Sequence, residues 1–346
     1  MKSTINQRPI AIWLFVCCLA IFAMVLLGGV TRLTGSGLSM VKWEPITGVL
    51  PPLNQTEWNE VFQLYQQSPE YIKKNSHFNL EEFKSIFWFE YSHRILGRLI
   101  GVIFLIPMLF FIATRRVGRT LTPKLVAMFI LGGLQGLLGW YMVKSGLVSN
   151  PHVSQYRLTA HFGLAVLVYG YIFWVALGLF FKSESSSAYS DSRQVLGYSR
   201  LISILVFITL LSGGFVAGLK AGFAYNTFPL MNGQVIPDGI LRLDPLWRNF
   251  FENIATVQFD HRVLATLLFF MIPIFWWRSL QFELSSRVRL GMHLMFGALL
   301  LQITLGISTL LLHVPIPLAS AHQGGALLLF TASLFVLQQL TASKAS

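Results

Sequence analysis

Eight apolar runs, each about twenty residues long, constrain this chain more than any other feature of its sequence. A helix needs about 20 apolar residues to cross the hydrocarbon core of a bilayer. The runs are continuous rather than alternating, which favours helices over a membrane β-barrel. Charged residues make up only 12% of the chain, against roughly 25% in soluble domains. We therefore predict an all-α integral membrane protein with eight transmembrane helices, at residues 10–27, 88–113, 124–143, 156–181, 201–218, 256–277, 290–311 and 318–337.

Much of the net charge of +12 lies in a few connections between these runs. In a soluble protein such an excess would suggest binding to nucleic acid. In a membrane protein, Lys and Arg gather in short cytoplasmic loops. The segments 114–124, 193–200 and 278–289, together with Lys2 and Arg8, therefore mark one side as cytoplasmic. Lipid, and not nucleic acid, is the expected partner.

The same rule fixes a topology and suggests a location. Both termini lie on the cytoplasmic side, and the long segments 28–87 and 220–255 lie outside. The N-terminus enters the first apolar run without an Arg- and Ser-rich presequence, so no cleavable signal or transit peptide is expected. This pattern favours a multi-pass protein of a bacterial inner membrane.

The chain contains an internal repeat. "FEYSHRILGRLIG" (89–101) resembles "VQFDHRVLATLLF" (257–269), and "LTAHFGLAVLV" resembles "ASAHQGGALLL". A third match joins 26–51 to 211–237, where Gly-Gly at a helix end precedes spaced prolines. Four helices in each copy give both copies the same orientation, which is a parallel repeat. We predict two pseudo-symmetric four-helix bundles, at 1–181 and 199–346, joined by a polar cytoplasmic linker at 182–198.

Each repeat places two histidines a few residues inside predicted helices, at similar depth: His93 and His161 in the first, His261 and His322 in the second. A lone intramembrane histidine can simply bond a neighbouring carbonyl or serine. Four at one depth, paired by the repeat, favour two flat cofactors ligated from both sides, as haem iron is by axial imidazoles. Zinc would normally need more ligands. Metal ligation by all four histidines is therefore expected.

Arginines directly follow two of these histidines. Arg94 and Arg262 lie near the predicted outer interface, where guanidinium groups match haem propionates. The alternative is that both side chains reach toward lipid headgroups.

One position differs between the repeats in a way that bears on chemistry. Glu90 lies three residues before His93, on one helical face, whereas the second repeat has Gln258. A carboxylate at membrane depth is costly and is a functional candidate. The asymmetry predicts chemistry in the first half, with Glu90, His93 and His161 as catalytic residues, and a permanent cofactor in the second. Glu90 can alternatively cap its helix or pair with Arg94.

These motifs, with "GGVTRLTGSGLSMVKWEP", "GGLQGLLGWYMVKSGL" and "NTFPLMNGQVIP", occur in order over nearly the whole chain. Together they resemble the heme A synthase family. The resemblance implies an oxidoreductase that converts the C8 methyl group of haem O to the formyl group of haem A, for use in terminal oxidases. It implies substrate haem in the first half, haem b in the second, His93, His161, His261 and His322 as ligands, and Glu90 as the outer-loop glutamate. It also implies delivery of haem O by a haem O synthase.

The chain departs from some members of that family in its cysteines. Its only two, Cys17 and Cys18, are adjacent in the first predicted helix and are expected to be packing residues. Some relatives carry a cysteine pair in the first outer loop, and this chain has none there. It therefore resembles the cysteine-free branch found in proteobacteria and mitochondria.

Two other functions fit the same ligands. A bis-histidine cytochrome b would pass electrons from quinol to a partner, and would need neither Glu90 nor a farnesylated haem. A haem carrier would exchange haem without changing it. The synthase reaction requires an electron acceptor as a partner. The sequence is also compatible with a homo-oligomer.

Overall fold

The computed structural model describes residues 6–42, 48–147, 151–181 and 192–344. Within these residues the regular structure is helical, and no strand forms beyond one isolated bridge between Met231 and Gln234. Eight helices are long and apolar enough to cross a membrane, which confirms the predicted fold class. They are α1 (Arg8–Leu33), α3 (Leu80–Ala113), α4 (Thr122–Gly146), α5 (Gln155–Phe180), α6 (Ser192–Gly218), α8 (Ile254–Ser279), α9 (Ser286–Leu311) and α10 (Ile316–Lys344).

Each helix begins before its predicted start, and two of them do so by about two turns or more. Helix α3 starts about two turns before residue 88, because Asn79 and Glu82 form a capping box in which each side chain accepts a hydrogen bond from the other's backbone N–H. Helix α6 starts at Ser192, so the predicted linker at 182–198 is helical in its second part. Its first part, at 182–191, lies outside the described residues.

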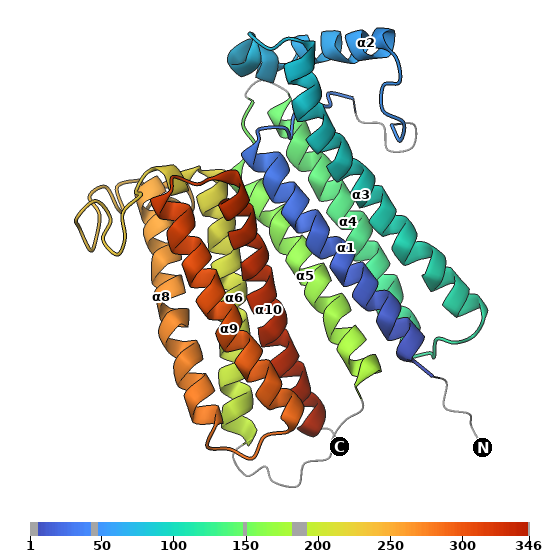
Figure 1. Ribbon diagram of the computed structural model, residues 1–346, viewed down its shortest axis with the longest axis vertical. Coiled ribbons are helices and arrows are strands. Elements are labelled where there is room, and N and C mark those ends of the chain that lie inside the picture. The colour runs from blue at the N-terminus through green and yellow to red at the C-terminus, as the bar shows by residue number, and fades with distance from the viewer. Residues whose placement is uncertain (1–5, 43–47, 148–150, 182–191, 345–346) are drawn as a thin grey trace.

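The eight helices pack as two groups of four (Figure 1). In the N-terminal bundle, α1 and α4 each contact both α3 and α5. In the C-terminal bundle, α6 and α9 each contact both α8 and α10. The same pattern of neighbours thus occurs in both bundles.

Four central helices join the two bundles through the contacts α1–α10, α5–α6 and α5–α10. Half of the most apolar window of α5 and of α10 is buried, against 6% in α4 and 11% in α9. The outer helices therefore present most of their apolar surface to lipid. Polar contacts also cross the junction, since Tyr169 Oη lies 2.7 Å from Thr331 Oγ1 and Gln323 Nε2 donates to the Val25 carbonyl at 2.9 Å.

The long connections lie together at one end of the molecule, here named the long-loop end. A cap made of α2 (Gln55–Gln66) and the π-helical turn η1 (Tyr71–Asn75) sits over the start of α3 (Figure 1). Five aromatic and aliphatic side chains form its core: Trp58, Tyr65, Phe83, Ile86 and Phe87. Because Phe83, Ile86 and Phe87 belong to α3, the cap fixes the turns of α3 that lead to Glu90.

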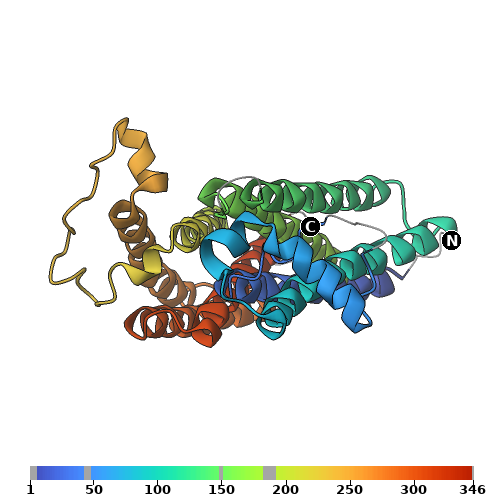
Figure 2. The ribbon, with the colours of Figure 1, turned by 90° about the horizontal axis from the view of Figure 1, so that it is seen from above.

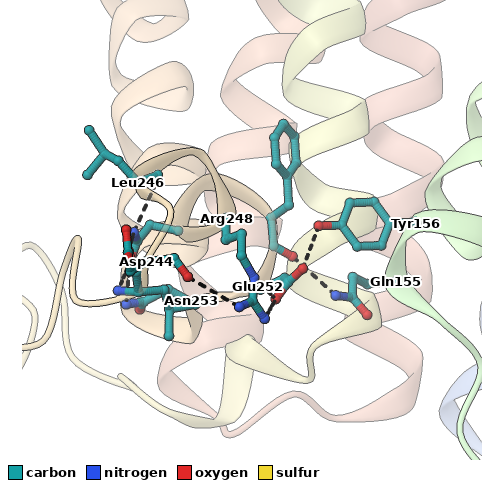
Figure 3. A network of polar contacts seen from close by, with 10 residues as sticks. Gln155, Tyr156, Asp244, Leu246, Arg248, Glu252 and Asn253 are labelled. Carbon is teal, nitrogen blue, oxygen red and sulfur yellow. Dashed lines mark hydrogen bonds and ion pairs between the residues drawn. The ribbon is translucent and has the colours of Figure 1, made fainter.

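The second long connection, between α6 and α8, extends to the side of the molecule away from the cap (Figure 2). It contains η2 (Ala221–Phe223), η3 (Leu246–Arg248) and α7 (Asn249–Glu252). A polar network ties it to the first turn of α5, where the Tyr156 hydroxyl donates to Glu252 at 2.9 Å and Gln155 Nε2 donates to the Phe251 carbonyl at 3.4 Å (Figure 3). The connection of one bundle is therefore attached to a helix of the other.

Candidate functional site

The structure brings His261 of α8 and His322 of α10 together in the C-terminal bundle. Their ring centroids lie 6.5 Å apart and their planes are inclined by 85°. A metal ion between two imidazoles, at about 2 Å per metal–nitrogen bond, requires ring centroids about 6 Å apart. The predicted pair therefore has the spacing for one metal between two rings.

A serine of α6 holds the ring of His261. Ser212 Oγ donates to the Thr209 carbonyl at 2.8 Å and lies 2.7 Å from His261 Nδ1. With the hydroxyl proton on the carbonyl, the serine oxygen accepts a hydrogen bond from Nδ1–H. The Nε2 atom of His261 is then unprotonated and available to a metal.

Glycines on neighbouring helices make room for all four histidine rings. At each of these glycines, a Cβ atom would lie between 2.7 and 3.3 Å from a histidine ring atom. The pairs are Gly28 with His93, Gly139 with His161, Gly213 with His261, and Gly306 with His322. The rings are thus packed against helix backbone on one side, and at Gly139 and Gly306, where the distance is below 3.0 Å, an added Cβ would force a shift.

The first pair lies in the N-terminal bundle, on α3 and α5. The side chains of His93 and His161 are both partly buried. Gln135 of α4 donates its Nε2–H to the His161 carbonyl at 2.9 Å and lies 3.5 Å from Nε2 of the same ring. No group of three or more His, Cys, Asp or Glu side chains suited to an ion occurs among the described residues.

Glu90 is 3% exposed and is fully engaged by its neighbours. Its Oε2 accepts hydrogen bonds from Ser39 Oγ at 2.7 Å and from the Met40 N–H at 2.8 Å. Its Oε1 accepts from Arg94 Nη2 at 2.6 Å, one turn along α3. Three donors, one of them a guanidinium group, stabilise the charged carboxylate here.

Gln258 occupies the corresponding place in the C-terminal bundle. Its Nε2 donates to the Tyr225 carbonyl at 3.0 Å, while its Oε1 is buried and has no hydrogen-bond partner among the described residues. The difference between Glu90 and Gln258 therefore extends to their surroundings, because one set of neighbours donates hydrogen bonds and the other accepts one.

Arg94 and Arg262 bind the connections that cover the two sites. Arg94 donates to the Met40 and Lys42 carbonyls at 2.8 and 2.9 Å. Arg262 donates to the Tyr225 and Thr227 carbonyls, both at 3.0 Å. Propionate binding by these arginines stays a prediction, and their loop contacts are a role that the sequence did not indicate.

Ser212 and Gln135 are the site residues that sequence reasoning missed. A serine and a glutamine within apolar runs are common and gave no signal on their own. The repeated Gly-Gly pairs at 28–29 and 213–214 were noted only as a mark of the repeat. Their contact with the histidines is decided by helix packing.

Fold and site together define a multi-pass helical membrane protein that brings two histidines of its C-terminal bundle, His261 and His322, close together. The family model of COX15-CtaA, described as cytochrome oxidase assembly protein, matches residues 11–334. The chain belongs to this family, which is that of heme A synthase.

Individual relatives match over nearly the whole chain. The heme A synthase of Nitrosospira multiformis is 59% identical over 96% of this chain and 94% of its own length. That of Nitrosomonas eutropha is 53% identical over 98% and 96%. Heme A synthase COX15 of Arabidopsis thaliana is 44% identical over 95% of this chain and 74% of its own length.

Proposed function

We propose that this protein is a heme A synthase, which oxidises the C8 methyl group of haem O to the formyl group of haem A. Near-full-length identity to proteins of that name supports the reaction. The single structural observation that carries it is the buried, triply hydrogen-bonded carboxylate of Glu90 beside one histidine pair, with a glutamine at the other.

The two histidine pairs take different haems in this proposal. His261 and His322 hold haem b in the C-terminal half, and the 6.5 Å ring separation and the free Nε2 of His261 support that assignment. His93 and His161 hold haem O in the N-terminal half. The bound haems supply one-electron redox chemistry, which a polypeptide lacks.

Glu90 has the role of a charged group at the substrate site. It lies on the same face of α3 as His93, one turn away. Its carboxylate stabilises positive charge that develops on the substrate, or its Oε2 accepts a proton from water that attacks the oxidised carbon. Arg94, Ser39 and the Met40 N–H hold the carboxylate in place for either task.

Location and partners follow from the same proposal. The long-loop end faces outward from a bacterial inner membrane, and both termini are cytoplasmic. Haem O arrives from a haem O synthase, and electrons leave to an acceptor.

Haem analysis tests the proposal directly. The protein is purified after co-expression with a haem O synthase, and its haems are extracted in acidic acetone and separated by reversed-phase chromatography with mass detection. Haem A or hydroxylated haem O, together with haem B, is the expected result. Haem B alone, with haem O available, would instead favour an electron-transfer cytochrome b or a haem carrier.

Glu90→Gln is the matched variant, because it gives the first site the amide of the second. We expect haem O to accumulate at the expense of haem A, while haem B content stays at the wild-type level. Full haem A yield in this variant would exclude a charged role for Glu90.

A further inference from the structure

A row of four glycines lies beside the histidines of the N-terminal bundle. They are Gly97 and Gly101 on α3, and Gly132 and Gly136 on α4. Those of α3 lie one and two turns beyond His93, and those of α4 lie one and two turns before Gly139, against which His161 packs. The row therefore begins at the histidines and runs toward the middle of both helices.

An aromatic contact shows that these faces of α3 and α4 meet. Phe104 of α3 and Phe129 of α4 stack with ring centroids 6.4 Å apart. Gly101 lies one turn from Phe104, and Gly132 lies one turn from Phe129, both on the side toward the histidines. The glycines thus line a groove, here named the glycine groove, that ends at the two phenyl rings. It is about 15 Å long from Gly139 to Phe129 at about 1.5 Å per residue.

The space beside these glycines is open. A Cβ atom added at Gly101, Gly132 or Gly136 would have no neighbour within 4 Å, and one added at Gly97 would meet only the flexible end of Met24, at 3.3 Å. All four glycines are exposed. The groove can therefore take up an apolar group without moving the helices.

The C-terminal bundle has larger side chains at the same places. With His93 aligned to His261 and Gly139 aligned to Gly306, the repeat gives a counterpart for each glycine of the groove. The counterparts are Ala265, Phe269, Leu299 and Ile303. Leu299 is 2% exposed, and Ile303 packs against the same core cluster, so these two positions face the bundle interior. The second bundle fills space that the first leaves open.

A buried acceptor beside the groove points to a bound group. Oε1 of Gln135, next to Gly136, is buried and has no hydrogen-bond partner among the described residues, and the same holds for Oε1 of its counterpart Gln302. A buried acceptor without a partner costs free energy, which a ligand that donates to it would recover. Each bundle thus has an acceptor for a ligand, and the glycines are what distinguishes the first ligand from the second.

We propose that the glycine groove binds the farnesyl chain of haem O, and that Gly101, Gly132 and Gly136 select haem O over haem B at the first site. The inference rests on the proposed function. Haem O carries a long apolar chain that haem B lacks. The groove is apolar, begins at the histidines and matches an extended farnesyl chain in length scale. Leu299 and Ile303 close the equivalent space in the bundle assigned to haem B, which has no such chain to place there.

Gly132→Leu and Gly136→Ile test the proposal, because they give the groove the side chains of the second bundle. Protein from cells without a haem O synthase is titrated separately with haem O and with haem B, and binding is followed by difference absorption spectra. The wild-type protein should bind haem O more tightly than haem B. Each variant should bind haem O at least about tenfold more weakly, the loss expected when about two methylene groups of the chain leave the groove. Its affinity for haem B should not change, which a general loss of structure would not reproduce.

Gly297→Leu is the matched control, since this glycine of α9 also has nothing within 4 Å of an added Cβ. It should bind both haems as the wild-type protein does. Equal weakening of both haems in Gly132→Leu, or unchanged haem O binding in both groove variants, would overturn the inference alone, and the second result would assign the groove to lipid. A wild-type protein without preference for haem O would overturn the inference alone if it still forms haem A, and the proposed function as well if it forms none.

Discussion

Gly306→Ala should displace His322, the proposed haem ligand, without unfolding the protein. Gly306 lies on α9, and an added Cβ would be 2.7 Å from Cε1 of His322. Contacts between carbon atoms become ordinary only at 3.4 Å or more. The ring must therefore move by about 0.7 Å, whereas metal–ligand distances vary by only about 0.2 Å. His322 is the end of a side chain, so the ring moves more easily than the helix.

The effect on folding has the opposite sign. Alanine is favoured over glycine inside a helix by about 0.5–1 kcal/mol. We therefore expect normal yield and helix content, with haem B reduced to a small fraction of the wild-type content. Gly297→Ala on the same helix is the matched control, since nothing lies within 4 Å of its added Cβ. It should keep full haem B.

The assay is haem B per polypeptide by pyridine haemochrome, with the low-spin electron paramagnetic resonance signal as a second readout. Gly139→Ala, whose Cβ would lie 2.9 Å from His161 Cε1, should do the same to the substrate haem. Full haem B with an unchanged signal in Gly306→Ala would show that the ring position in the structure is not the ligand position.

Three further changes test the surroundings of the site. Burial raises the pKa of Glu70 in the cap to about 7, whereas the unfolded carboxyl group titrates near 4.5. The cap should therefore lose stability as pH rises between these values, by about 3 kcal/mol at about 1.36 kcal/mol per pKa unit. Hydrogen exchange of the Gln55–Gln66 amides measures this loss, and Glu70→Gln should abolish it. Arg94→Ala leaves the carboxylate of Glu90 buried and without its cationic partner, so it should lower the free energy of unfolding by about 3 kcal/mol or more in thermal unfolding. A loss of stability no larger than that of Glu90→Gln would count against the ion pair. Hydrogen bonds from Arg248 and Tyr156 lower the pKa of Glu252. These bonds should therefore stabilise the α7 segment at pH values above the ordinary pKa of a carboxyl group, and this stabilisation should be lost as pH falls through the lowered pKa. Tyr156→Phe should speed the hydrogen exchange of α7 at pH 7 and weaken its pH dependence.

The sequence predicted the membrane fold because hydrophobic length is a local property. Each span needs only its own residues to satisfy its backbone hydrogen bonds, so an apolar run of sufficient length determines a helix by itself. The prediction was weakest at the helix ends. Helix α3 starts at Leu80 rather than at residue 88, because a capping box extends a helix beyond its apolar part.

The candidate residues were also readable from the chain, because a histidine or a glutamate at membrane depth is costly and so stands out. His93, His161, His261, His322 and Glu90 needed no structure to be selected. What each of them touches was not readable. The Glu90–Arg94 pair was one of two alternatives left open, and only the position of Ser39 and Met40 beside Oε2 shows how the carboxylate is held.

The sequence by itself thus determined that this chain crosses a membrane eight times and carries four histidines in two related settings. Only the tertiary structure decided that His261 rests against the hydroxyl of Ser212 and that His93 packs against Gly28. The physical reason is that the partner of each ring comes from a different helix. Which atoms meet there depends on how the helices rotate and approach one another, and no local pattern in the chain records that.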